Sequence, residues 1–239
     1  MEQIIKQGVL KDNVYYLPNV KLDRKEYLDI AEHLKFLGGK WKGRGLNGFI
    51  FDRQISSIDE LLGNNIKVKK DIQLFETPES IADKLVEYAE IDNYQTILEP
   101  SAGRGRIIKS IQKVCSCQID YCEINDVNRK YLDEIKNINF LEEDFLKLKT
   151  NKKYTRILAN PPFAKNQDID HIMKMYELLS EKGILVSMSS NHWQMAKEKK
   201  CQEFRKFIEY TNAEVIELQN GDFKESGTLV KGNIIIIRK

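Results

Sequence analysis

The chain has 239 residues, of which 41% are hydrophobic and 31% are charged, and its formal net charge is +2. This length can bury one core with room for a small extra module, and the composition is that of a soluble globular protein. No apolar run approaches the roughly 20 residues that a membrane span needs, and the N-terminus lacks a signal-peptide core, so we expect a cytoplasmic protein with no membrane partner.

Residues 1–70 predict a small α+β module. The segment from residue 22 to residue 39 has the three- and four-residue spacing of an amphipathic helix, and Gly38 would end it; its apolar face would hold Tyr27, Ile30, Ala31, Leu34 and Leu37. Residues 40–52 predict two short strands around a glycine-rich turn.

The positive charge of the chain gathers in this first module, around one tryptophan. The cations near Trp41 are Lys40, Lys42, Arg44 and Arg53. Such a set can contact the phosphates and bases of a nucleic acid. The alternative, a tryptophan in a hairpin core with solvated lysines, stays open.

Residues 71–239 predict a second domain in which helices and strands alternate with short connections. This pattern is typical of a doubly wound, Rossmann-like α/β fold with helices on both faces of a mostly parallel, seven-stranded sheet. Thr77 would be the N-cap and Pro78 the first residue of its first helix. The last strand, rich in isoleucine, follows the sixth without a helix and is therefore expected to be antiparallel. No internal repeat is present.

Three of the four cysteines, Cys115, Cys117 and Cys122, lie in one apolar segment that predicts a buried strand, and the fourth is Cys201. No histidine or further Cys-x-x-Cys pair completes a zinc set. We therefore expect the cysteines to pack as small hydrophobic residues and expect no metal.

The ends of the first two predicted strands of this domain carry groups that suit a nucleotide-like ligand. Glu99 ends the first strand, and Gly103 and Gly105 follow where a helix begins; glycines there let a backbone approach a ligand closely, although many such turns use glycine for geometry alone. Glu123 ends the second strand, 20 residues after Gly103, which is the spacing at which a carboxylate reaches ribose hydroxyls. A helix-capping acid is the alternative.

The third and fourth strands end in further polar and aromatic groups. Asp144 and Phe145 can accept from an adenine amine and cover its ring, or they form an acidic turn with a core phenylalanine. Residues 160–163 are Asn-Pro-Pro-Phe, a stiff corner whose backbone offers acceptors and almost no donors. The Asn-Pro-Pro-Phe corner suits a ligand that donates hydrogen bonds. The four strand ends should meet at one edge of the sheet.

Together these residues resemble the class I S-adenosylmethionine-dependent N6-adenine DNA methyltransferases. The likeness spans residues 73–239 and rests on the Phe-x-Thr-Pro box at residues 75–78, Glu-Pro-Ser-Ala-Gly-Arg-Gly at 99–105 and Asn-Pro-Pro-Phe at 160–163. The order of these boxes resembles the gamma-type arrangement. That type commonly has a large target-recognition domain after the catalytic part, whereas this chain stops at the last strand. Recognition of the target would then fall to residues 1–70 or to a partner protein, or the enzyme would require little sequence specificity in its target.

The resemblance implies a cofactor, S-adenosyl-L-methionine, and a set of residues that hold it. Its methionine end would be lined by Phe75, Thr77 and Pro78, its amino-acid and sulfonium region by Glu99, Ser101, Gly103 and Gly105, its ribose by Glu123, and its adenine by Ile124, Asp144 and Phe145.

The resemblance also implies the catalytic residues, Asn160, Pro161, Pro162 and Phe163. The Asn160 side-chain oxygen and the Pro161 carbonyl would accept the two hydrogens of the adenine amine, Phe163 would stack on the base, and Phe223 would be a second aromatic wall or a core residue. Trp41, Lys42 and Arg44 would contact DNA. The target base must leave the duplex or be single-stranded.

Other substrates and roles stay open at this point. Ribosomal RNA base amines and protein glutamine amides present the same planar amine to Asn-Pro-Pro-aromatic sites, and a nucleic-acid-binding protein with a relic fold is a third hypothesis. Asn191, His192 and Trp193 follow the fifth strand as a lid over nucleic acid or as a packed loop, and His33 and His171 receive no role.

Overall fold

The computed structural model describes residues 1–43, 45–62, 76–218 and 232–239. The chain divides into two compact units, Met1–Leu74 and Phe75–Lys239. No helix in these described ranges is both long enough and apolar enough to cross a membrane.

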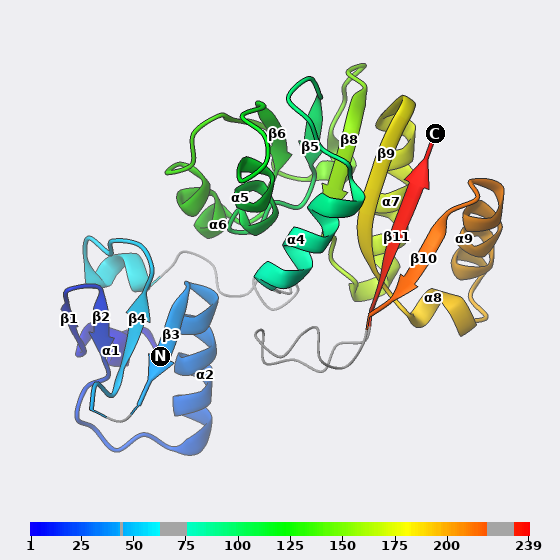
Figure 1. The fold of residues 1–239 in the computed structure, drawn as a ribbon. Coiled ribbons are helices and arrows are strands. Elements are labelled where there is room, and N and C mark those ends of the chain that lie inside the picture. Colours follow the sequence, from blue (N-terminus) through cyan, green and yellow to red (C-terminus); the bar gives the residue numbers. More distant parts are fainter. Residues whose placement is uncertain (44, 63–75, 219–231) are drawn as a thin grey trace. The chain divides into compact units, whose positions relative to one another are not determined.

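The first unit holds a four-stranded antiparallel sheet in the order β1-β2-β4-β3 together with short helices (Figure 1). Its elements are α1 (Glu2–Lys6), β1 (Val9–Lys11), β2 (Val14–Tyr16), α2 (Arg24–Phe36), β3 (Gly39–Lys42), β4 (Gly48–Phe51) and the 3-10 helix η1 (Ile58–Leu61).

Helix α2 begins at a capping box, in which the Glu26 N–H donates to Asp23 Oδ1 at 2.8 Å and the Asp23 N–H donates to Glu26 Oε2 at 3.1 Å. It ends before Gly38, whose φ of 98° reverses the chain as predicted. Ile30, Ala31, Leu34 and Leu37 are buried, but Tyr27 is 36% exposed, so its place on the apolar face was wrongly predicted.

The second unit contains a seven-stranded sheet with helices on both faces. Its elements are α4 (Glu79–Tyr88), β5 (Ile97–Glu99), α5 (Arg106–Gln112), β6 (Ile119–Cys122), α6 (Asp126–Leu132), β7 (Ile138–Glu142), η2 (Phe145–Lys147), β8 (Tyr154–Ala159), η3 (Ala164–Asn166), α7 (Gln167–Leu178), β9 (Leu179–Ser190), α8 (His192–Met195), α9 (Lys199–Tyr210), β10 (Glu214–Glu217) and β11 (Gly232–Arg238).

The strand order is β10-β11-β9-β8-β5-β6-β7, and β11 is antiparallel to both of its neighbours while the pairs from β9 to β7 are parallel (Figure 1). This confirms the predicted doubly wound, mostly parallel sheet with an antiparallel last strand. Strand β9 begins at Leu179, directly after α7.

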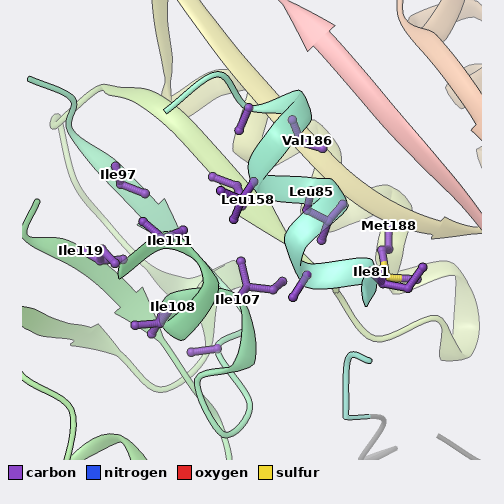
Figure 2. Close-up of a cluster of buried hydrophobic side chains, with 14 of the residues drawn as sticks. Ile81, Leu85, Ile97, Ile107, Ile108, Ile111, Ile119, Leu158, Val186 and Met188 are labelled. Carbon is purple, nitrogen blue, oxygen red and sulfur yellow. The ribbon is translucent and has the colours of Figure 1, made fainter. Parts of the chain in front are cut away.

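Alternate side chains of the central strands enter two separate cores. In β11, Ile234 and Ile236 join the core beneath α4 and α5, whereas Ile235 and Ile237 join the core beneath α7 and α9. Figure 2 shows the first core, where side chains of α4 and α5 meet side chains of β5, β6, β8 and β9. Because both faces are covered, the central strands are largely apolar, with a few buried polar residues such as Asp120 in β6 and Ser187 in β9.

Two local predictions are corrected by the structure. Thr77 is not the N-cap of α4: that position belongs to Pro78, whose extended backbone (φ −56°, ψ 147°) directly precedes the helix. Cys115 and Cys117 form a disulfide before β6, so packing as free, buried thiols is confirmed only for Cys122 and Cys201.

Candidate functional site

The candidate site lies where the strand order in the sheet reverses. Strand β5 pairs in parallel with β6 on one side and with β8 on the other, and β6 and β7 extend the sheet away from β8. Glu99, Glu123 and Asn160 stand at or just beyond the carboxyl ends of β5, β6 and β8. Such a switch point is where open α/β sheets bind ligands.

The turn after β5 presents its backbone to Glu123 and to open space. Gly103 has a φ of 55°, and its N–H donates to Glu123 Oε2 at 2.6 Å. A Cβ atom added at Gly103 would meet no atom within 4 Å, whereas one added at Gly105 (φ 78°) would lie 2.6 Å from Ile135 Cδ1 and 2.9 Å from Leu132 Cδ2. Gly103 therefore faces a space that a ligand can use, and Gly105 is also needed for packing.

This difference predicts distinct effects for two matched substitutions. Gly103→Ala places a side chain on a left-handed backbone without a steric contact, and it should lower the free energy of unfolding by about 1–2 kcal/mol. Gly105→Ala adds the contact with Leu132 and Ile135 and should lower it by about 2–4 kcal/mol. Urea denaturation of both variants tests the order, and an equal loss would contradict it.

Two carboxyl groups are buried side by side at this turn. Glu123 is 7% exposed and also accepts from the Asn125 N–H at 2.8 Å and from Asn128 Nδ2 at 3.1 Å. Glu99 is 1% exposed, and its Oε2 atom has no hydrogen-bond partner within the described ranges. Burial raises the pKa of Glu99 well above its ordinary value, the charge of Glu123 raises it further, and burial likewise raises the pKa of Glu123. The pair is suited to a positively charged ligand.

The Glu99 carboxyl should make the unliganded protein less stable as the pH rises. Its raised pKa means that the folded protein holds a proton which the unfolded chain has lost, so the free energy of unfolding falls as the pH rises from about 4.5 toward the raised pKa. Glu99→Gln removes this loss, and the variant should be more stable than the parent by about 1–3 kcal/mol near pH 7.5, with the difference shrinking toward pH 4. Urea denaturation across this pH range checks the trend. Glu87→Gln, on the exposed side of α4, is the control, and a pH-independent difference would contradict it.

The remaining predicted cofactor residues differ in how accessible they are. Ile124 is 52% exposed beside Glu123. Asp144 accepts from the Leu146 N–H at 3.0 Å, which shapes the turn after β7. Phe145 is 2% exposed, and its ring lies 5.3 Å from that of His171, so it supports this turn from the core rather than offering a free ring face.

His171, which the sequence left without a role, reaches the site from α7. Its Nδ1 atom is 3.3 Å from the Ser101 hydroxyl. Burial lowers the pKa of His171 to about 4, so the imidazole is neutral at neutral pH and holds the serine by a hydrogen bond. Its place on the apolar face of α7, close to Ile172 and Met175, was the only sequence signal for burial.

The corner after β8 is joined to the segment before α4. Asn160 Nδ2 donates to Thr77 Oγ1 at 3.0 Å, and Thr77 is 7% exposed. The donor side of the amide is thus engaged, which leaves the Oδ1 atom to accept from a ligand. Pro161 is buried and Pro162 and Phe163 are half-buried, with Phe163 packed against the core beneath α4.

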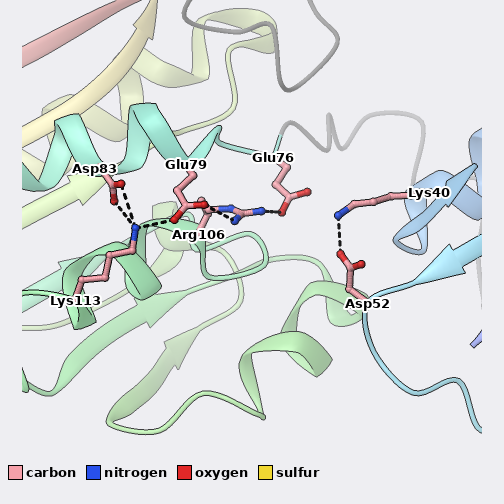
Figure 3. Close-up of polar contacts among 7 residues, drawn as sticks. All are labelled: Lys40, Asp52, Glu76, Glu79, Asp83, Arg106 and Lys113. Atoms are coloured by element: carbon pink, nitrogen blue, oxygen red, sulfur yellow. Dashed lines mark hydrogen bonds and ion pairs between the residues drawn. The ribbon is translucent and has the colours of Figure 1, made fainter. Parts of the chain in front are cut away.

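An ion-pair network holds the segment that carries Thr77 (Figure 3). Arg106 pairs with Glu76 at 2.8 Å, and Lys113 pairs with Glu79 at 2.7 Å and with Asp83 at 2.9 Å. Single exposed pairs contribute little, but this network ties both ends of α5 to the start of α4 at several points. Arg106 and Glu76 flank Thr77 and Gly105 in sequence, so the network fixes two parts of the site together.

In the first unit, Trp41 is 41% exposed on β3, which is an edge strand, and its ring lies edge-on to Phe49 at 5.0 Å. Lys42 is exposed, whereas Lys40 pairs with Asp52 at 2.6 Å (Figure 3). Trp41 is therefore not enclosed in a hairpin core. Arg44, Phe75 and Phe223 lie outside the described residues.

Comparisons with known proteins identify the fold of the second unit. No protein-family model matches the chain. It is 22% identical over 187 residues to the release factor glutamine methyltransferase of Clostridium acetobutylicum, covering 72% of this chain and 62% of that protein. It is 30% identical over 115 residues to the type II methyltransferase M.AccI of Acinetobacter calcoaceticus, covering 45% of this chain and 21% of that protein. The chain thus spans less than two thirds of the length of each.

Among solved structures, the methyltransferase subunit of the type I restriction-modification system of Streptococcus thermophilus superposes with a TM-score of 0.57 at 16% identity, over 76% of this chain and 49% of that one. At this identity the likeness concerns the fold alone. The second unit therefore has the fold of the class I S-adenosylmethionine-dependent methyltransferases.

Proposed function

We propose that this chain transfers a methyl group from S-adenosyl-L-methionine to the exocyclic N6 amine of adenine in DNA. The observation that carries the proposal is the Asn160 amide, held by Thr77 at the carboxyl end of β8, next to the switch point where Glu99, Glu123 and Gly103 lie. An amine acceptor and a place for a positively charged cofactor thus stand on neighbouring strands.

The residues present fit the cofactor. S-adenosyl-L-methionine, when bound, supplies an electrophilic methyl group on a sulfonium. Glu99, buried with an unpartnered oxygen beside a second carboxyl, suits its positive charges, and the open space at Gly103 lets the backbone approach it. Glu123 would hold the ribose, Ile124 and Asp144 the adenine, Ser101 the amino-acid and sulfonium region, and Thr77 and Pro78 the methionine end.

The Asn-Pro-Pro-Phe corner would prepare the target amine. The adenine amine is a poor nucleophile because its lone pair is delocalised into the ring. If Asn160 Oδ1 and the Pro161 carbonyl each accept one of its hydrogens, the nitrogen moves toward tetrahedral geometry and its lone pair localises. The prolines hold both acceptors in place at low entropic cost, and Phe163 would stack on the base.

The choice of DNA as the substrate is supported by the first unit and by the proteins to which this chain is similar. The adenine amine is inaccessible inside a duplex, so the base must be extruded or single-stranded. The exposed Trp41, with Lys42 and Arg44 nearby in sequence, suits stacking and phosphate contact. A type II methyltransferase and a restriction-modification subunit among the matches also favour DNA, and the latter is consistent with a partner protein that supplies recognition.

A second candidate keeps the chemistry and changes the substrate. The likeness to a release factor glutamine methyltransferase favours a protein glutamine amide, which presents the same planar amine to the same acceptors. An RNA base amine would fit the acceptors in the same way.

One assay separates these substrates. The purified chain is incubated with methyl-labelled S-adenosyl-L-methionine and, in separate reactions, adenine-containing duplex DNA, single-stranded DNA, ribosomal RNA and cell protein. We expect label in DNA, recovered as N6-methyladenine. Label found only in RNA or protein would overturn the DNA assignment, and no label in any reaction would indicate a binding protein.

A further inference from the structure

A second cluster of reactive side chains lies after β9, apart from the residues assigned above. His192 of α8, Glu198 at the N-cap of α9 and Cys201 in the first turn of α9 bring an imidazole nitrogen, a carboxylate oxygen and a sulfur within 4.8 Å of one another. His192 and Glu198 are exposed, and Cys201 is buried. Nitrogen, oxygen and sulfur are the three atom types that zinc takes from proteins.

We propose that His192, Glu198 and Cys201 form a site for a divalent transition metal, with Zn²⁺ as the best fit. The three ligand atoms converge on one point: Glu198 Oε2 is 3.0 Å from His192 Nε2 and 3.2 Å from Cys201 Sγ. In a tetrahedral zinc site, ligand atoms lie about 3.3–3.7 Å apart. Small adjustments of the three side chains toward these spacings would admit the ion and replace the two hydrogen bonds with metal bonds.

The charges of this cluster also balance. Zn²⁺ with one carboxylate, one thiolate and a neutral imidazole has no net charge, and the Cys201 thiol gives its proton to solvent on binding. Two lysines follow Glu198 directly and would repel an uncompensated cation. Both have acidic partners: Lys199 lies 3.7 Å from Glu203, and Lys200 lies 2.5 Å from Asp170.

The elements that carry the three ligands are held together without a metal. Arg205, one turn after Cys201, donates to the carbonyl oxygens of Trp193 and Ala196 at 2.5 Å and 3.0 Å. The Trp193 ring, 4% exposed, packs edge-on against Phe204 at 5.1 Å, and its N–H donates to Ser189 Oγ at 3.2 Å. A site built on such fixed segments loses little conformational freedom on binding an ion.

The metal would join α8 to the start of α9, because His192 lies on α8 while Glu198 and Cys201 lie at the N-terminus of α9. The side chains of His192 and Glu198 are exposed, which leaves room for a water molecule as the fourth ligand.

Metal titration of the full chain, treated with EDTA and assayed without added thiol, tests the site. With Co²⁺ as the probe, we expect one equivalent to give the near-ultraviolet thiolate-to-cobalt absorption and tetrahedral visible bands, and Zn²⁺ to displace it and raise the melting temperature. Cys201→Ser should abolish the near-ultraviolet band. His192→Ala, an exposed position that does not threaten folding, should weaken Co²⁺ binding by more than about tenfold.

Two controls make the result specific. Glu198→Gln should weaken binding, whereas Glu203→Gln on the same helix should not. Cys122→Ala removes the other free thiol and should leave the band intact. No band with the parent protein, or a band that survives both Cys201→Ser and His192→Ala, would overturn the proposal. Because metal binding is read without any methyl acceptor, this outcome is independent of whether the chain methylates DNA.

Discussion

Asn160→Ala is expected to slow methyl transfer by about 100- to 1,000-fold while changing the affinity for S-adenosyl-L-methionine less than twofold. The reason is that the Oδ1 atom of Asn160 would stabilise the positive charge that develops on the amine only during transfer. The donors of an oxyanion hole act in the same way on a developing negative charge. Within the described residues, the Asn160 amide hydrogen-bonds Thr77 and makes no hydrogen bond with Glu99 or Glu123, the carboxyl groups at the ends of β5 and β6. Single-turnover transfer and cofactor titration calorimetry measure the two effects separately.

Asn160→Asp is the matched variant for this prediction. It keeps an acceptor oxygen of nearly the same shape, and the Thr77 hydroxyl can donate to it, so we expect part of the activity to remain. If Asn160→Ala weakened cofactor binding as strongly as it slowed transfer, the division of roles between the strand ends would be wrong.

Thr77→Val is expected to lower the rate of methyl transfer by about 10- to 100-fold with little change in stability of the fold. Valine has the shape of threonine but cannot accept from Asn160 Nδ2, so the amide would no longer be held with its oxygen toward the substrate. A misplacement of about 1 Å at a reacting group can cost about a hundredfold in rate. Because the contact acts through Asn160, Thr77 is here a positioning residue, and steady-state kinetics should show a lower kcat with the KM for DNA nearly unchanged.

Rescue by serine separates positioning from packing. Thr77→Ser retains the hydroxyl and loses a methyl group, so it should recover most of the rate. Thr211→Val is the control for a lost threonine hydroxyl, because its Oγ1 donates to Phe207 and Ile208 carbonyls in α9. A Thr77→Val enzyme with parental kcat would show that Asn160 is oriented by other contacts.

The sheet could be predicted from the sequence because its signals are local. Apolar β-branched runs bounded by turns mark the strands, and the loop before the last strand indicates its antiparallel direction. Gly103 and Glu123 were likewise predicted to lie at the same edge of the sheet, and the structure joins them by a hydrogen bond of 2.6 Å, which was not predicted. Here the two residues are brought together by a single strand–helix–strand unit, so the intervening chain determines the contact.

The contacts between distant segments could not be predicted in this way. Asn160 and Thr77 are 83 residues apart, and Ser101 and His171 are 70 apart. Each meeting depends on the order of strands in the finished sheet. Thr77 shows the limit well: a threonine before a proline is a sound local N-cap signal, but the tertiary fold uses its hydroxyl for Asn160.

The first unit was the least predictable part. Strands β1 and β2 have three residues each, which is too short for an alternating pattern to stand out. The cluster that we propose as a metal site could not be predicted for a different reason. His192, Glu198 and Cys201 are spaced unlike the common zinc motifs, and their convergence depends on the turn between α8 and α9.

The position of β11 has a consequence for how the protein is made. This strand lies between β9 and β10, yet it is the last of the seven to leave the ribosome. Until residues 232–238 have left the exit tunnel, β9 exposes one unpaired edge and β10 has no neighbour in the described sheet. This end of the sheet therefore forms in one late step, when β11 inserts between two segments that were made before it.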